Sequence, residues 1–302
     1  MSILLDKKLV VAGVARDCAM YLPSILEFLQ KLEKKFLEVN YIFVENDSTD
    51  TTNEILRMFS QKKNGTLITL NGLGSIKQRC KRLEIARNAY IDQIKNTKHL
   101  YEADFLLVLD LDDVNEKFND IGLLEDQFKI LLAKKEAAAV FANTTPNYYD
   151  LWALRHEEIC PEDIFMEVAK KVVKEKKFTS EMLKTTFIGS KVPVRIDPKN
   201  EELIEVESAF GGMGIYKMPY IIANPLKYIG TQTVNLSESP DEYAYINAEV
   251  CEHVEFNRGV RMQGGVLLIN PKFVILEESI GEINVPFITS LYTNFSGLPV
   301  FN

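Results

Sequence analysis

Short apolar runs alternate with amphipathic segments through the first half of the chain. Several runs have the length of a buried strand, and between them apolar residues recur at helical spacing. Strands are expected at Leu9–Val14, Tyr41–Val44, Thr66–Leu70, Phe105–Leu109 and Val140–Asn143. Helices are expected at Leu22–Phe36, Arg79–Ile94 and Leu123–Lys134. A further helix is expected to begin at the Thr51-x-x-Glu54 capping box. This alternation predicts an α/β, Rossmann-like fold with a mostly parallel sheet and helices on both faces.

The second half of the chain is less regular. Lys170–Lys177 holds five lysines and one acid, a pattern typical of a solvated helix face. Ser208–Lys217 is rich in small residues and leads into an expected strand, and Val266–Ile269 and Phe273–Leu276 are expected to be two late strands. No internal repeat or flexible linker separates these segments, so residues 1–302 are expected to form a single domain.

Composition limits the partners that this chain can have. The 302 residues are 46% hydrophobic and 26% charged, which is ample apolar material for a core. A net charge of −8 argues against a nucleic-acid partner. No apolar run approaches the roughly 18 residues of a membrane span, and Met1–Lys8 lacks the layout of a signal peptide. We therefore expect no membrane span and a cytoplasmic location, with four widely spaced cysteines as free thiols.

A buried strand ends abruptly in the carboxylates of Asp110, Asp112 and Asp113. Burying them without a partner would cost several kcal/mol each, so they must meet a cation, a positive group or water. Asp110 and Asp112 point to the same side if the strand continues. Two such carboxylates suit a hard divalent ion that also holds phosphate oxygens. An acidic loop without a ligand is the alternative interpretation of these residues.

Polar segments also follow two other expected strands. In open parallel sheets ligands bind at the carboxyl ends of the strands, which is where Ala15-Arg16-Asp17 and Glu45-Asn46-Asp47 lie. An acid such as Glu45 can accept hydrogen bonds from a base N–H or a ribose hydroxyl. Arg87, in the helix before the acidic strand end, is a candidate to reach a diphosphate or ribose, and Arg79 and Arg82 are nearby alternatives.

Several segments together resemble a known enzyme class. Phe105–Val114 (FLLVLDLDDV) resembles the DxD segment of nucleotide-sugar glycosyltransferases with the GT-A fold, and Val44–Thr52 (VENDSTDTT) resembles their VDDGSTDGT segment. Tyr148–Arg155, Val206–Lys217 and Cys251–Asn257 then follow in the order found in the fungal capsule-associated α-1,3-mannosyltransferase-like family. The Cys-Trp-Asn stretch of that family is replaced by Ala209-Phe210-Gly211, which leaves the sugar and the acceptor open.

This resemblance implies a GT-A fold with a smaller acceptor-side subregion, and it divides the chain into a nucleotide-binding half at 1–145 and an acceptor-side half at 146–302. It implies transfer of a hexose-type sugar from a nucleoside diphosphate sugar to a glycan hydroxyl, with Mn²⁺ or Mg²⁺ as cofactor, and it suggests retention of configuration. The metal ligands would be Asp110, Asp112 and His253, with Asp113 as the alternative to Asp112. The donor-binding residues would be Ala15, Arg16, Glu45, Arg79, Arg87, Asp110 and Leu111.

The acceptor-side half offers candidates that would face the sugar. Gly211 and Gly212 allow close backbone approach to a sugar or acceptor, and Trp152 can stack on a sugar face. Glu207, Glu249 and Glu252 are candidates for a general base, or for a carboxylate that supports charge at the anomeric carbon. Glu249 and Glu252 share a face if their segment is helical.

Two other functions stay open at this point. A nucleotide-sugar- or glycan-binding protein could keep this fold and have lost turnover. Asp-x-Asp-x-Val after an apolar run also fits haloacid-dehalogenase-type phosphatases, in which Asp110 would be the nucleophile and Asp112 the acid/base. That family usually has this motif near its beginning and a later lysine, whereas three expected strands precede it here.

Overall fold

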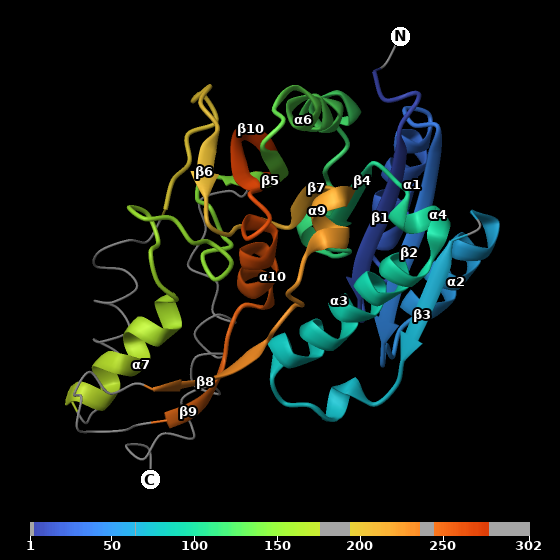
Figure 1. Ribbon diagram of the computed structural model, residues 1–302. Coiled ribbons are helices and arrows are strands. Elements are labelled where there is room, and N and C mark those ends of the chain that lie inside the picture. Colours follow the sequence, from blue (N-terminus) through green and yellow to red (C-terminus); the bar gives the residue numbers. More distant parts are fainter. Residues whose placement is uncertain (1–2, 64, 176–193, 236–244, 278–302) are drawn as a thin grey trace.

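The computed structural model describes residues 3–63, 65–175, 194–235 and 245–277 (Figure 1). Its strands are β1 (Lys8–Ala15), β2 (Glu38–Asn46), β3 (Thr66–Leu70), β4 (Phe105–Leu109), β5 (Ala137–Thr145), β6 (Ile204–Val206), β7 (Met213–Lys217), β8 (Thr231–Asn235), β9 (Tyr245–Glu249) and β10 (Val266–Glu277). Its helices are α1 (Leu22–Glu33), α2 (Thr52–Lys62), α3 (Arg79–Asn96), α4 (Lys98–Tyr101), α5 (Asp113–Glu116), α6 (Ile121–Ala133), α7 (Ile164–Glu175), α9 (Met218–Ala223) and α10 (Glu252–Arg261), with a 3₁₀ turn at Leu73–Ser75.

The main sheet has eight strands in the order β3-β2-β1-β4-β7-β5-β10-β6. β1 pairs in parallel with β2 and β4, β2 with β3, and β10 with β5. β7 runs antiparallel between β4 and β5, and β6 runs antiparallel to β10. The predicted α/β fold with a mostly parallel sheet is therefore confirmed. Strands from both halves of the sequence belong to one continuous sheet.

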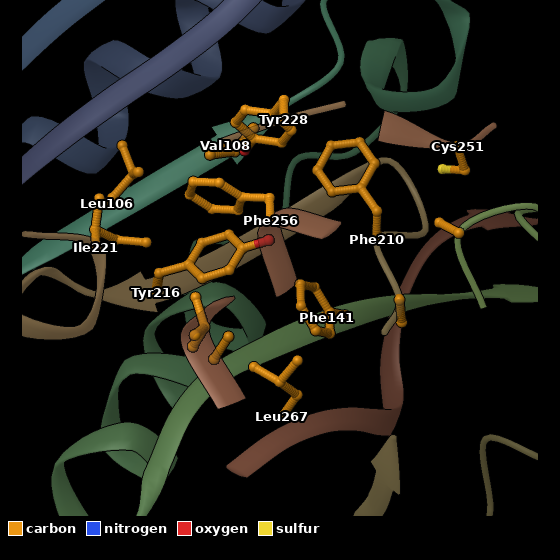
Figure 2. Packing of buried hydrophobic residues seen from close by; sticks show 14 of the residues in the cluster. Leu106, Val108, Phe141, Phe210, Tyr216, Ile221, Tyr228, Cys251, Phe256 and Leu267 are labelled. Carbon is orange, nitrogen blue, oxygen red and sulfur yellow. The ribbon is translucent and has the colours of Figure 1, made fainter. Parts of the chain in front are cut away.

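Both faces of this sheet are covered by helices (Figure 1). Successive side chains of β1 point to opposite faces. Val10 and Ala12 therefore join the hydrophobic cluster under α3, α9 and α10, whereas Leu9 and Val11 join the cluster under α1, α2 and α6. In the first cluster, the rings of Tyr228 and Phe256 stack with centroids 4.1 Å apart (Figure 2). Fully burying a large apolar side chain stabilises the fold by roughly 1.5–3 kcal/mol.

Two local predictions differ from the structure. Val266–Ile269 and Phe273–Leu276 belong to one strand, β10, which passes an irregular register between Ile269 and Val274. The expected capping box does not form, because the Thr51 side chain makes no capping hydrogen bond. Asp50 accepts instead from the backbone N–H groups of Thr52 (2.9 Å) and Ala19 (3.0 Å), which ties α2 to the loop after β1.

The second half adds smaller elements around the sheet. β8 and β9 form a two-stranded antiparallel ribbon, which lies at the lower edge of Figure 1. α7 covers most of the lysine-rich segment, and Lys176 and Lys177 lie outside the described residues. Within the described ranges, no helix combines the length and the apolar character that crossing a membrane would require.

Candidate active site

A cavity opens beside the carboxyl end of β4. Its wall comes from five places in the chain: the first half of α3, the segment after β4, residues 149–152, Phe210 and the start of α10. Its volume is about 140 Å³, whereas pockets that enclose a whole small-molecule ligand have roughly 300–1,000 Å³. The described residues therefore enclose only part of a ligand of nucleotide size.

Asp110 and Asp112 stand at this end of β4 and line the cavity. The Asp110 N–H donates to the Gly212 carbonyl (2.9 Å), which extends the β4–β7 pairing by one residue. Asp112 caps α5 and accepts from the Val114 N–H (3.3 Å). Burial raises the pKa of Asp110, and burial together with Asp110 and Asp113 raises the pKa of Asp112 to about 7. A further positive charge would therefore stabilise the ionised carboxylates of Asp110 and Asp112, which together form the acidic corner.

The positive charge nearest to this acidic corner is Arg87, whose side chain is only 3% exposed. Its Nε donates to Glu252 Oε1 (2.9 Å), and its Nη2 donates to Asp110 Oδ1 (3.2 Å). The guanidinium lies over the rings of Phe210 and Tyr228, at 5.0 and 5.9 Å from their centroids. Nη1 is buried and has no hydrogen-bond partner among the described residues. One guanidinium therefore links carboxylates from β4 and α10 and keeps N–H groups to spare.

His253 lies beside this ion pair on the cavity wall. Its ring stacks on Phe210 with centroids 4.0 Å apart, and neither ring nitrogen has a hydrogen-bond partner in the described part of the chain. Burial, together with Arg87 and Arg79, holds the pKa of His253 well below its usual value, so the imidazole is neutral. A buried neutral imidazole with two unused nitrogens is a group that a ligand or a metal can satisfy.

The donor set fits a divalent cation in its chemistry. Asp110 and Asp112 supply hard oxygen ligands, and a neutral imidazole such as His253 suits Mn²⁺. Across the described ranges, no three His, Cys, Asp or Glu side chains are gathered closely enough to form a complete metal centre. A cation held here would therefore take part of its coordination shell from water or from a bound ligand.

Gly211 and Gly212, expected to bind the sugar or the acceptor, do not line the described cavity. Both have positive φ angles, +64° and +84°, which L side chains rarely adopt. A Cβ on Gly212 would lie 2.5 Å from Val114 Cγ1. The Gly212 carbonyl accepts from Asp110 N–H and Asn115 Nδ2 (both 2.9 Å), so this loop holds the acidic corner in position.

Asp150 is a cavity residue to which the sequence assigned no role. Its Oδ2 accepts from the Gly211 N–H (3.0 Å), so it supports the loop that positions Asp110. Burial raises the pKa of Asp150 to about 6. The sequence feature that could have identified Asp150 was its place near Trp152, in a segment that resembles a family motif.

Trp152 lies on the cavity wall, as a sugar-stacking residue requires. Its Nε1 donates to Asp163 Oδ2 (3.1 Å), and Arg155 Nη2 donates to the same oxygen (2.8 Å). The Trp and the Arg of this segment are therefore held by one carboxylate next to α7. Stacking of Trp152 on a sugar stays a prediction.

Glu45 and Asp47 shape the turn after β2. Glu45 is 2% exposed, and its carboxylate accepts from the Ser48 N–H (2.8 Å) and from Asn53 Nδ2, so it is engaged within the turn. Asp47 has a φ of +50°, the left-handed conformation that a glycine adopts easily. The expected contact of Glu45 with a nucleoside would have to replace one of these internal hydrogen bonds.

The remaining donor-side candidates are spread along the carboxyl edge of the sheet. Ala15 and Leu111 are buried in the hydrophobic cluster under α1. Arg16 is exposed, with its Nε 3.5 Å from Asp17 Oδ2. Arg79 is exposed at the first position of α3 and is one of the two arginines on the cavity wall. It has no hydrogen-bond or ion-pair partner among the described residues.

Only one of the three glutamates expected in catalysis, Glu252, lines the cavity. Glu249 ends β9, and its carboxylate accepts from the Cys80 N–H at the start of α3. Glu207 is 60% exposed, and its Oε1 lies 3.4 Å from Arg261. Glu249 and Glu252 do not share a helix face, because α10 begins at Glu252.

Several apolar or weakly polar wall residues were given no functional role from the sequence: Leu83, Val114, Phe210, Cys80 and Cys251. Burial raises the pKa of both thiols well above the usual value, which keeps them protonated. Val114, Phe210 and Cys251 lie in segments that carry the family resemblance, whereas the hint for Cys80 was its place next to Arg79.

No known protein family and no curated protein matches this chain in sequence. Solved structures resemble it at low identity. Mannosyltransferase PcManGT from Pyrobaculum calidifontis, in complex with GDP-Man and Mn²⁺, is 12% identical with a TM-score of 0.47, over 98% of this chain and 71% of that one. S. aureus TarS 1–349 in complex with UDP-GlcNAc is 13% identical with a TM-score of 0.47, over 96% and 67%.

A third similar structure is glucosyl-3-phosphoglycerate synthase from Mycobacterium tuberculosis in complex with Mn²⁺, UDP and phosphoglyceric acid. It is 11% identical with a TM-score of 0.40, over 97% of this chain and 80% of that one. Other alignments span 57% of TarS 1–349 and 35% of the longer TarS structure. At these identities and scores the likeness concerns the general course of the chain and says nothing of its reaction.

Proposed function

We propose that this chain is a metal-dependent glycosyltransferase of the GT-A type. It would move a hexose-type sugar from a nucleoside diphosphate sugar to a glycan hydroxyl. The observation that carries the proposal is the cavity at the end of β4, where Asp110 and Asp112 share one wall with Arg79 and Arg87. A diphosphate with its divalent cation needs both kinds of group, because carboxylates bind the cation and guanidinium groups bind phosphate oxygens.

In this proposal Asp110 and Asp112 hold Mn²⁺ or Mg²⁺, and His253 is the third candidate ligand. A bound divalent cation supplies charge neutralisation for the leaving diphosphate. Arg79 is suited to bind phosphate because it is exposed at the cavity and has no competing ion pair in the described part of the chain. Arg87 offers a second guanidinium from deeper in the same wall.

Glu252 is the carboxylate best placed to act on the reacting sugar. The transfer breaks the bond between the anomeric carbon and a diphosphate oxygen, forms a bond to the acceptor oxygen, and releases the hydroxyl proton. Arg87 Nε, at 2.9 Å, fixes the orientation of Glu252 on the cavity wall. From there Glu252 can accept the proton or face the positive charge that builds at the anomeric carbon.

A thermal-unfolding panel tests this proposal. The chain is heated with UDP-, GDP- and dTDP-sugars, each with and without Mn²⁺, and release of the nucleoside diphosphate is measured in parallel. A ligand at about 100 times its Kd stabilises by roughly 2.7 kcal/mol, so one donor class should raise Tm by several degrees, with Mn²⁺ required. Absence of both a shift and release with every donor contradicts the proposal.

Asp112→Asn is the matched catalytic variant. It keeps the size of the side chain and should abolish Mn²⁺-dependent release while the far-UV circular dichroism stays that of the folded chain. Asp113→Asn, one residue on and exposed, tells which of the two carboxylates is the second ligand. Unchanged turnover in both variants would reject the metal assignment.

A binding protein without turnover is the second candidate. It is favoured by the Arg87–Asp110 ion pair, which already engages one of the two expected metal ligands. Donor binding without release of a nucleoside diphosphate would identify it. The phosphatase alternative has less support, because no lysine lines the described cavity. Hydrolysis of p-nitrophenyl phosphate without a nucleotide sugar would revive it.

A further inference from the structure

Asp110 is the meeting point of two competing positive groups. Its Oδ1 accepts from Arg87 Nη2 at 3.2 Å, and the same carboxylate is an expected ligand of the divalent cation. Two cations close to one carboxylate repel each other. Any cation that binds Asp110 therefore competes with Arg87.

Arg87 itself cannot move far to relieve this competition. Its side chain is 3% exposed, and its Nε is held by Glu252, which is 4% exposed. The ring of Phe210 packs against the guanidinium. Asp110 has more freedom, because its side chain is 22% exposed and its Oδ2 makes no hydrogen bond among the described residues. The contact that opens is therefore the single one between Nη2 and Oδ1.

Opening that contact changes what Arg87 can bind. Nη1 is already buried without a partner in the described part of the chain, and Nη2 would become free beside it. The N–H groups of one guanidinium, pointing in parallel, match two oxygens of one phosphate. The Nε contact with Glu252 would hold the guanidinium in place on the cavity wall.

We propose that Arg87 is an internal counter-ion of Asp110, which a divalent cation displaces and thereby turns into a diphosphate ligand. This inference rests on the proposed function and concerns how the site is loaded. Its consequence is cooperative binding: the cation increases the affinity for the diphosphate, and by linkage the diphosphate increases the affinity for the cation by the same factor. If Arg87 instead replaces the cation permanently, the diphosphate binds equally well without metal.

The test measures Mn²⁺ binding to the full chain by the loss of the free Mn²⁺ signal in electron paramagnetic resonance. UDP and GDP binding is measured by calorimetry with and without Mn²⁺. In the wild type, Mn²⁺ should raise the affinity for one nucleotide by at least about tenfold. In Arg87→Gln, Mn²⁺ alone should bind about tenfold tighter, and the coupling to the nucleotide should fall below about threefold.

Two comparisons separate this effect from misfolding and from general electrostatics. Arg87→Gln leaves Glu252 buried without its partner, so the double variant Arg87→Gln/Glu252→Gln is also compared with Glu252→Gln alone. Arg82→Gln is the control for general electrostatics, because it removes a positive charge from the same helix. Arg82 Nη1 donates to the Ile76 carbonyl (2.6 Å), and the variant should change Mn²⁺ affinity by less than about threefold.

Each outcome has a distinct meaning. Tighter Mn²⁺ binding in both Arg87 variants supports the counter-ion. Unchanged or weaker Mn²⁺ binding in them, with Mn²⁺-dependent nucleotide binding intact, overturns the counter-ion and leaves the proposed function standing. Nucleotide binding that is independent of Mn²⁺ in the wild type also overturns it. Failure of every variant to bind Mn²⁺, with or without nucleotide, overturns both.

Discussion

Asp112 and Asp150 are carboxyl groups that the fold holds away from water. The pKa of each is raised by burial, to about 7 and about 6, whereas an aspartate in an unfolded chain titrates near 3.9. The folded chain therefore binds these protons more tightly than the unfolded chain does. Without ligand, the contribution of both groups to the free energy of unfolding is largest below about pH 4 and is lost as the pH rises through about 7.

The stabilisation by Mn²⁺ should depend on pH for the same reason. A cation at Asp112 has to displace a proton below about pH 7, so the rise in Tm on adding Mn²⁺ should be small at pH 5.5 and larger at pH 8. Scanning fluorimetry at both pH values measures this difference. Asp112→Asn should remove most of it, and an equal Mn²⁺ effect at both pH values in the wild type would contradict the assignment.

Gly212 is the residue on which the shape of the acidic corner depends. With a φ of +84° and a Cβ position 2.5 Å from Val114 Cγ1, alanine would meet both backbone strain and overlap. Gly264 has a φ of +76°, and a Cβ added there would have no atom within 4 Å, so alanine at this position measures the cost of the backbone strain alone. Gly264→Ala should cost about 1–2 kcal/mol, and Gly212→Ala at least about 1 kcal/mol more. Urea unfolding measures both variants, and equal losses would show that the overlap is relieved.

At the scale of elements, the starts of two helices build the cavity. α3 begins at Arg79 and α10 begins at Glu252, and these two residues and their neighbours form the wall. The ribbon of β8 and β9 connects them, because Glu249 at the end of β9 accepts from the Cys80 N–H of α3. The second half thus carries α10 to the site and also satisfies an orphan donor at the start of α3.

This contact predicts which of two glutamates matters for stability. Glu249→Ala removes the acceptor at the start of α3 and should lower the free energy of unfolding by about 0.5–2 kcal/mol, the usual range for a lost helix cap. Glu207→Ala removes an exposed carboxylate 3.4 Å from Arg261 and should change it by less than about 0.5 kcal/mol. Chemical denaturation compares the two, and the reverse order would refute the capping role.

Element prediction succeeded where the local pattern matched the tertiary environment. β3 and β4 have the predicted bounds. β4 is buried throughout, and a strand buried on both faces is a continuous apolar run. β3 is a partly exposed edge strand in which two threonines interrupt the apolar residues. β10 was predicted as two strands because Asn270, Pro271 and Lys272 interrupt the apolar pattern. Pairing with β5 on both sides of the irregular register joins them into one strand, a contact between distant segments that no local pattern contains.

For the molecule as a whole, the central observation is the placement of β7. This strand comes late in the sequence and runs antiparallel between β4 and β5 of the first half. Removing the second half would expose edges on both of those strands. The single domain predicted from the sequence, with a nucleotide-binding and an acceptor-side half, stays a prediction. The physical reason to expect a single domain is that one continuous sheet contains strands from both halves.

Cooperative unfolding tests this whole-molecule prediction. The chain has one tryptophan, Trp152, which lies in the second half, whereas far-UV circular dichroism reports helices in both halves. The two signals should give the same urea midpoint and slope, because a single cooperative unit unfolds at once. Separate midpoints would show that the acceptor-side half unfolds on its own.

The sequence by itself determined the alternation of strands and helices, the class of fold, and the acidic end of the fourth strand. Those features follow from local periodicity and from the cost of burying charge, which short segments carry within themselves. Only the tertiary structure decided that Arg87 pairs with both Asp110 and Glu252, and that Glu249 caps a helix. It also decided that neither ring nitrogen of His253 has a hydrogen-bond partner among the described residues. Arg87 and Glu252 are 165 residues apart and Cys80 and Glu249 are 169 apart, whereas Arg87 and Asp110 are 23 apart and belong to different elements. Separation along the chain gives no measure of distance in space, so no local pattern contains these contacts.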